Sequence, residues 1–134
     1  MIKNRMIILL ILFISSVAYT GCANKNDQNT TENTRRDITV AELKEQMQNN
    51  PDLVILDVRT KEELTGELPK IESAINIPLQ ELENKMDELK IYKDKKIAVI
   101  CRSGRRSSIA TDLLVKNGYI AENVLGGMKA YFKK

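Results

Sequence analysis

Residues 101–107, with the sequence CRSGRRS, contain the side chains whose types and spacing could carry out covalent chemistry. Cys101 supplies a thiol, and three arginines within the next five residues supply positive charge that favours the thiolate. A thiolate is a strong nucleophile, and clustered arginines attract anionic molecules. The segment therefore predicts nucleophilic or anion-binding chemistry centred on Cys101.

The sequence around this segment predicts a strand before it and a helix after it. Residues 97–100 are a continuous apolar run typical of a buried strand, and Ile109, Ala110, Leu113 and Leu114 are expected to face inward on the helix. Unpaired N–H groups at the helix N-terminus, together with a left-handed Gly104, would surround the sulfur with backbone donors. We therefore expect an exposed thiol of lowered pKa; a structural, buried cysteine is the alternative.

The rest of the pattern predicts helices alternating with strands. The predicted elements are helices at residues 40–49, 60–65 and 128–132, an apolar helical stripe at Leu79, Leu82, Met86 and Leu89, and strands at 53–56, 74–77 and 123–125. The first two helices each begin with a capping-box pattern. This order predicts an α/β sandwich around a mainly parallel sheet, with chemistry beyond the carboxyl ends of the strands.

The composition excludes several classes of function. The chain has 134 residues and a formal net charge of +3, a balance too even to indicate nucleic-acid binding. There is no histidine and there are two cysteines, so one chain cannot assemble the usual zinc sites or a Ser-His or Cys-His pair. We therefore expect no metal site.

The N-terminus has the layout of a targeting segment. Lys3 and Arg5 precede an apolar run over residues 6–17, which is shorter than the about 20 residues that a membrane span requires. Residues 19–22 (YTGC) resemble the bacterial lipobox, with tyrosine where leucine is usual. In that motif, the cysteine is lipidated and becomes the mature N-terminus.

We therefore predict a lipoprotein held outside the cytoplasm at the cell membrane by lipid on Cys22. The predicted organisation is a signal peptide at residues 1–21, a flexible polar tether at 22–36 and a folded domain at 37–134. An uncleaved helical anchor and ordinary secretion with a free Cys22 are the alternatives.

Four motifs occur in an order that resembles single-domain rhodaneses, which are sulfurtransferases. They are residues 56–60 (LDVRT), 74–79 (AINIPL), 100–107 (ICRSGRRS) and 123–130 (NVLGGMKA). The resemblance implies a three-layer α/β/α sandwich with a mainly parallel sheet of about five strands. It also implies that sulfane sulfur from a donor such as thiosulfate passes to a thiol or cyanide acceptor, without cofactor or metal.

The resemblance also assigns roles to individual residues. Cys101 is the expected nucleophile and persulfide carrier, and Arg102 with Arg105 or Arg106 would orient an anionic donor. The backbone amides that would form the anion cradle belong to Arg102, Ser103, Gly104, Arg105, Arg106 and Ser107. Asp57 is expected at the rim of the site, bonded to the active loop or to an arginine. Arg59 is expected to be structural and paired with a carboxylate, and the turn at residues 126–127 is also expected to be structural.

Two other functions fit parts of the pattern. A Cys-dependent phosphatase or arsenate reductase requires an arginine six positions after its nucleophile, but that position is Ser107 and Arg106 comes one step earlier. A catalytically silent, membrane-tethered binding module would have no use for a stabilised thiolate. Residues 66–72 (GELPKIE) replace the shorter Gly-His-Ile segment usual in the family, which leaves the shape of the substrate site open.

Overall fold

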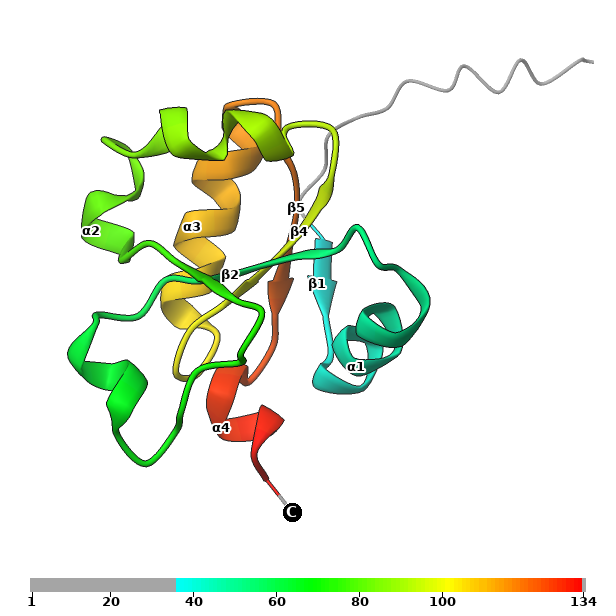
Figure 1. The fold of residues 1–134 in the computed structure, drawn as a ribbon, viewed down its shortest axis with the longest axis vertical. Coiled ribbons are helices and arrows are strands. Elements are labelled where there is room, and N and C mark those ends of the chain that lie inside the picture. Colours follow the sequence, from blue (N-terminus) through cyan, green and yellow to red (C-terminus); the bar gives the residue numbers. More distant parts are fainter. Residues whose placement is uncertain (1–35, 134) are drawn as a thin grey trace, which may run out of the picture. The chain divides into compact units, whose positions relative to one another are not determined.

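Five parallel strands form the centre of residues 36–133, the part of the chain that this computed structural model describes (Figure 1). The strands are β1 (Arg36–Ile38), β2 (Val54–Asp57), β3 (Ile75–Asn76), β4 (Lys96–Ile100) and β5 (Ile120–Val124), in the order β1-β5-β4-β2-β3 across the sheet. The helices are α1 (Val40–Asn49), α2 (Leu79–Leu82), α3 (Arg105–Lys116) and α4 (Gly127–Tyr131), with 3₁₀ helices η2 (Glu62–Thr65) and η3 (Met86–Tyr92). The predicted α/β sandwich with a parallel sheet is confirmed.

Alternation along the central strand β4 creates a separate core on each face of the sheet. Ile97, Val99 and Cys101 pack in the cluster that includes α2 and α3, whereas Ala98 and Ile100 pack in the cluster that includes α1 and α4 (Figure 1). Successive side chains of a strand point to opposite faces. The side chain of residue 101 therefore continues the odd-numbered row and turns toward α3.

The apolar stripe at Leu79, Leu82, Met86 and Leu89 does face the core, but the prediction of a single helix is wrong. The α-helix α2 ends at Leu82, and a 3₁₀ helix begins at Met86. Leu82 and Leu89 are fully buried, and the other two side chains pack against them. Met86 and Leu89 are three residues apart, a spacing that the 3.0-residue turn of a 3₁₀ helix places on one side.

The helix α3 differs from its prediction at Ile109, which is 54% exposed. The buried face consists of Ser107, Ala110, Thr111 and Leu114. At about 100° per residue, position 109 lies about 200° from position 107 and so faces away from the sheet. Two polar residues occupy inward positions, which the apolar pattern could not indicate.

The strand β5 begins three residues before the predicted strand at 123–125, and β1 was not predicted. The sequence pattern did not predict all of β5 because Glu122 and Asn123 are polar. Both residues are nevertheless buried, at 4% and 2% exposed. The Glu122 carboxylate accepts a hydrogen bond from Gln46 Nε2 at 2.9 Å and lies 3.3 Å from Lys96 Nζ. These partners satisfy the charge that made the segment unlike a buried strand.

The two predicted capping boxes have different outcomes. Thr39 and Glu42 form a complete box at the start of α1. The box at residues 60–63 is wrong: Thr60 N donates to the Glu63 carboxylate at 3.2 Å, but no side chain caps η2. The predicted signal peptide, Cys22 and most of the tether lie outside the described residues. Within residues 36–133, no helix combines the length and hydrophobicity needed to cross a bilayer.

Candidate active site

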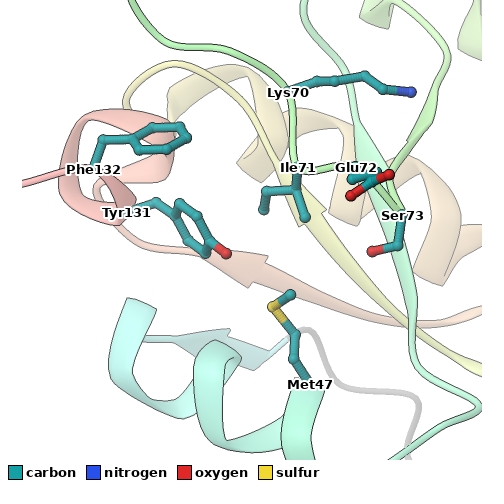
Figure 2. A pocket seen from close by; sticks show the side chains of 7 residues that line it. All are labelled: Met47, Lys70, Ile71, Glu72, Ser73, Tyr131 and Phe132. Atoms are coloured by element: carbon teal, nitrogen blue, oxygen red, sulfur yellow. The ribbon is translucent and has the colours of Figure 1, made fainter.

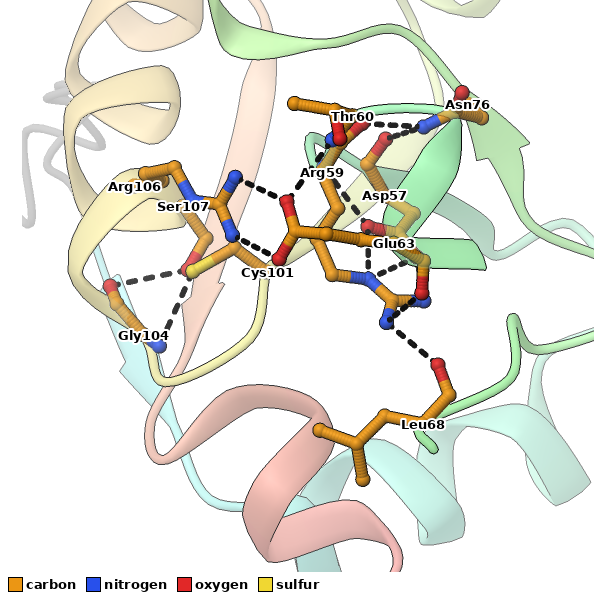
Figure 3. Close-up of polar contacts among 10 residues, drawn as sticks. All are labelled: Asp57, Arg59, Thr60, Glu63, Leu68, Asn76, Cys101, Gly104, Arg106 and Ser107. Carbon is orange, nitrogen blue, oxygen red and sulfur yellow. Dashed lines mark hydrogen bonds and ion pairs between the residues drawn. The ribbon is translucent and has the colours of Figure 1, made fainter. Parts of the chain in front are cut away.

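The Cys101 thiol lies in the turn between β4 and α3, where the backbone folds around the sulfur (Figure 3). Gly104 N donates to Sγ at 3.2 Å, and Ser107 Oγ lies 3.4 Å from the same atom. Gly104 has a φ of +96°, in the left-handed region that glycine adopts without a steric penalty. The expected turn of backbone amides toward the sulfur is therefore present.

Two opposing effects set the ionisation of this thiol. Burial acts to raise the pKa of Cys101, but the Ser107 hydroxyl and the N–H groups of Ser107, Ser103 and Gly104 bring the pKa below its ordinary value. Residue 101 is only 1% exposed, so the expectation of an exposed thiol is wrong. A buried thiol is inert in purely apolar surroundings, but here hydrogen-bond donors also face the sulfur and favour the thiolate.

The three loop arginines do not share one environment. Arg102 and Arg105 are exposed, whereas Arg106 donates from both terminal nitrogens to the Glu63 carboxylate, at 2.6 and 2.7 Å. This pairing lowers the pKa of Glu63 to about 2 and raises the pKa of Arg106. Of the two alternatives for orienting a donor together with Arg102, Arg106 is thus already paired with a carboxylate, whereas Arg105 is exposed.

Asp57, the last residue of β2, and Arg59 form a buried ion pair. Arg59 NH2 lies 2.7 Å from Asp57 Oδ2, and each side chain is 1% exposed. Arg59 also donates to the Leu68 carbonyl at 2.6 Å and thereby holds the segment that follows η2 (Figure 3). The expected pairing of Arg59 with a carboxylate is confirmed, while the expected position of Asp57 at the rim is wrong because the residue is buried.

The turn at Gly126–Gly127 supports the loop from below the sheet edge. Met128 N donates to the Cys101 carbonyl at 2.8 Å, and Lys129 N donates to the Arg102 carbonyl at 3.0 Å. A Cβ at Gly127 would collide with the Cys101 carbonyl oxygen and would lie 2.8 Å from Ser103 N. The turn is structural, as expected, and its function is to carry the backbone of the candidate active loop.

Sequence reasoning assigned no role to two residues whose side chains contact this loop, Glu63 and Asn123. Asn123 Oδ1 accepts from Ser107 Oγ at 2.7 Å. Asn123 begins one of the four motifs and Glu63 follows another by three residues, but their partners are distant in sequence. A charged or amide side chain inside a buried motif was the available signal.

The segment at residues 66–72 lines a pocket of about 530 Å³ with α1 and α4 (Figure 2). The residues that line it are Met47, Lys70, Ile71, Glu72, Ser73, Tyr131 and Phe132. None of the described loop residues 101–107 belongs to this lining. Residues 70–72 of the unusual segment therefore shape a pocket that does not include the loop around the thiol.

The fold and the loop together define a class of protein: a parallel α/β domain with a cysteine at a strand-to-helix turn, held by backbone donors. The sequence pattern of the rhodanese-like domain family matches residues 39–134. The chain belongs to this family.

Individual relatives have related names. "Putative sulfurtransferase YtwF" of Bacillus subtilis (strain 168) is 37% identical over 97 residues, which cover 72% of this chain and 89% of that protein. Thiosulfate sulfurtransferase PspE of Escherichia coli (strain K12) is 34% identical over 74 residues, covering 55% and 69%. The crystal structure of a rhodanese-like domain protein from Staphylococcus aureus matches with a TM-score of 0.66 and 31% identity, covering 74% and 93%.

Proposed function

We propose that this protein is a sulfurtransferase that carries sulfane sulfur on Cys101. One observation carries the proposal: the Cys101 sulfur accepts a hydrogen bond from Gly104 N at 3.2 Å and is faced by the Ser107 hydroxyl. These donors favour an anionic sulfur at neutral pH. The names of the relatives, which include two sulfurtransferases, support the same reaction class.

In the first half-reaction, the Cys101 thiolate attacks the outer sulfur of thiosulfate. A bond forms between Sγ and that sulfur, the sulfur–sulfur bond of thiosulfate breaks, and sulfite leaves with the bonding electrons. The product is a Cys101 persulfide anion. In the second half-reaction, cyanide or a thiolate attacks the outer sulfur of the persulfide, and the Cys101 thiolate leaves.

The burial of Cys101 bears on the donor. Residue 101 is only 1% exposed, so little of its side chain is open to an approaching donor. A terminal sulfane sulfur, as in thiosulfate, meets that condition better than a sulfur flanked by bulky groups. Ser107 stands where a phosphatase of this type needs an arginine, and it directs a hydroxyl to the sulfur instead. These contacts favour sulfur transfer over phosphate hydrolysis.

The test is to expose the full chain to thiosulfate and to measure its intact mass. We expect the gain of one sulfur atom, and tryptic digestion places it on the peptide of residues 97–102, which contains Cys101 and excludes Cys22. Cys22→Ser should gain the same atom, whereas Cys101→Ser should gain none at this peptide. A wild-type chain that takes up no sulfur would favour the binding module and refute the proposal.

We also propose that lipid on Cys22 anchors the domain outside the cytoplasm. The support is the order of positive charge, apolar run and YTGC in residues 3–22. The test is to feed an alkyne fatty acid to a bacterium that produces the chain, and to measure whether the chain becomes labelled. Wild type and Cys101→Ser should both be labelled and Cys22→Ser should not; labelling that survives in Cys22→Ser would contradict the anchor.

A further inference from the structure

Ser107 has one hydroxyl proton and three acceptors within reach. Its Oγ lies 2.7 Å from Asn123 Oδ1, 3.0 Å from the Gly104 carbonyl oxygen and 3.4 Å from Cys101 Sγ. A serine hydroxyl donates only one proton, although its oxygen also accepts. The hydroxyl therefore cannot donate fully to Asn123 and to the sulfur at the same time, and these two acceptors compete for the proton with each other and with the Gly104 carbonyl.

Asp37 holds Asn123 in the orientation that makes it an acceptor. Asn123 Nδ2 donates to Asp37 Oδ1 at 2.8 Å, and the two residues face each other in the register of β5 and β1. An ionised carboxylate accepts hydrogen bonds and donates none. Asp37 thus keeps the amide nitrogen on its own side, which leaves Oδ1 facing Ser107. A chain of three side chains runs from β1 across β5 to the sulfur.

Burial makes this competition consequential. Ser107 is fully buried and Asn123 is 2% exposed, so an acceptor that loses its donor gains little from solvent. Leaving a buried acceptor without a partner costs more free energy than an average hydrogen bond contributes. Whichever of Asn123 and the sulfur lacks the hydroxyl proton therefore loses a hydrogen bond that solvent does not replace, although the sulfur keeps its backbone donors.

We propose that Asn123, held by Asp37, is a positioning residue that sets the thiol–thiolate balance of Cys101 through the Ser107 hydroxyl. In the thiol state, the hydroxyl donates to Asn123 and its oxygen faces the S–H group. When the S–H proton leaves to solvent, the hydroxyl turns to the sulfur anion and Asn123 Oδ1 loses its donor. Asn123 thus opposes ionisation, while Ser107 supports it.

Other charged groups lie around the loop, and none of them is substituted in the variants below. Asp37 is the one charged residue that the variants change. The unchanged groups are Asp57 at the end of β2, Arg59 after it, Glu63 on η2, Arg102, Arg105 and Arg106 on the loop and α3, and Lys129 on α4. Because these groups contribute equally to the pKa of Cys101 in all variants, a difference in that pKa between variants reports the hydrogen bonds from Asp37 through Asn123 to Ser107. The inference concerns the thiol of the proposed function, but its test requires no sulfur transfer.

The test measures the rate at which iodoacetamide alkylates Cys101 in the full chain as a function of pH. The peptide of residues 97–102 separates this cysteine from Cys22. Asn123→Leu removes the acceptor Oδ1 and keeps a similar side-chain volume. It should lower the apparent pKa of the thiol by about one pH unit, which gives about tenfold more thiolate below the midpoint. Ser107→Ala should raise the apparent pKa. In the double variant, the substitution at 123 should have no further effect.

Asp37→Ala changes the exposed end of the hydrogen-bonded row Asp37–Asn123–Ser107. It keeps the proposal testable if Asn123→Leu does not fold. Without the carboxylate, the Asn123 amide can rotate and donate to Ser107, which should also lower the apparent pKa. Asp37→Asn is the matched control, since it removes the charge and keeps an acceptor oxygen. In this variant, the apparent pKa of Cys101 should stay near that of wild type.

Two results would overturn the inference. One is an apparent pKa in Asn123→Leu, or in Asp37→Ala if the former does not fold, that equals or exceeds that of wild type. The other is an effect of Asn123→Leu that persists in the Ser107→Ala background. Sulfur loading is measured separately, so a chain that titrates as expected but takes up no sulfur would refute the proposed function and support this inference.

Discussion

Arg106 and Glu63 form an ion pair with two hydrogen bonds, NH1 to Oε2 at 2.6 Å and NH2 to Oε1 at 2.7 Å, that joins the candidate active loop to η2. The side chains are 27% and 24% exposed, so solvent screens the pair only in part. Cys101 is, after Glu63, a further group that favours the charged form of the Arg106 guanidinium. Glu63 therefore controls how much of this positive charge acts on the sulfur.

Removal of the Glu63 charge should make the thiol more acidic. In Glu63→Gln, the Arg106 charge is no longer compensated, and we expect the apparent pKa of Cys101 to fall by about half a unit to one unit. The measurement is the pH dependence of alkylation at Cys101. Glu62→Gln, one residue earlier and exposed, is the control and should leave the pKa unchanged. A rise in Glu63→Gln would show that the pair acts on the loop by geometry and not by charge.

The same pair should make stability depend on pH in acid. Arg106 lowers the pKa of Glu63 from 4.5 to about 2 in the folded protein. The carboxylate therefore stabilises the fold above its unfolded pKa, and this contribution is lost as the pH falls from 4.5 toward 2. Between about pH 5 and pH 3, the urea midpoint should decrease more in wild type than in Glu63→Gln. Parallel decreases in the two proteins would contradict the prediction.

Substitution of Arg59 should be far more costly than substitution of a surface partner. Arg59→Met leaves the Asp57 carboxylate buried without its cation, which should lower the free energy of unfolding by about 3–5 kcal/mol. Lys95→Met breaks a pair with Asp52 of similar length, 2.8 Å, but exposed, and should have little effect on stability because solvent screens the two charges. Urea unfolding of both variants gives the comparison. Equal costs would mean that the buried pair contributes no more than a surface pair.

The two glycines Gly127 and Gly118 should respond differently to the same substitution. Both have positive φ, +55° and +81°, so alanine is strained at either position by about 1–2 kcal/mol. At Gly118, a Cβ would meet only the flexible Lys93 side chain, at 3.6 Å. At Gly127, it would strike the backbone of residues 101–103, so the loop must move.

We therefore expect Gly127→Ala to lose sulfur loading at Cys101 as well as stability, whereas Gly118→Ala loses stability alone. Intact mass after thiosulfate treatment and urea unfolding provide the two measurements. If Gly127→Ala loads sulfur at the wild-type rate, the support from the Gly126–Gly127 turn is not required for the reaction.

Local patterns were sufficient to predict the layers and the loop. Residues 97–100 predicted the central strand because a strand buried on both faces needs a continuous apolar run. The α1 capping box formed as predicted because Thr39 and Glu42 find each other within one turn. Gly104 adopts the expected positive φ because the turn requires it. In each case, the physical cause lies within a few neighbouring residues.

The sequence alone determined that a cysteine stands between a buried strand and a helix N-terminus. Only the tertiary structure decided which distant groups meet there: Glu63 with Arg106, 43 residues apart, and Asp37 with Asn123, 86 residues apart. These partners depend on the order and register of the strands, which bring β1 beside β5 and η2 beside the loop. Local periodicity encodes which face of an element is buried, but it does not encode which element covers that face.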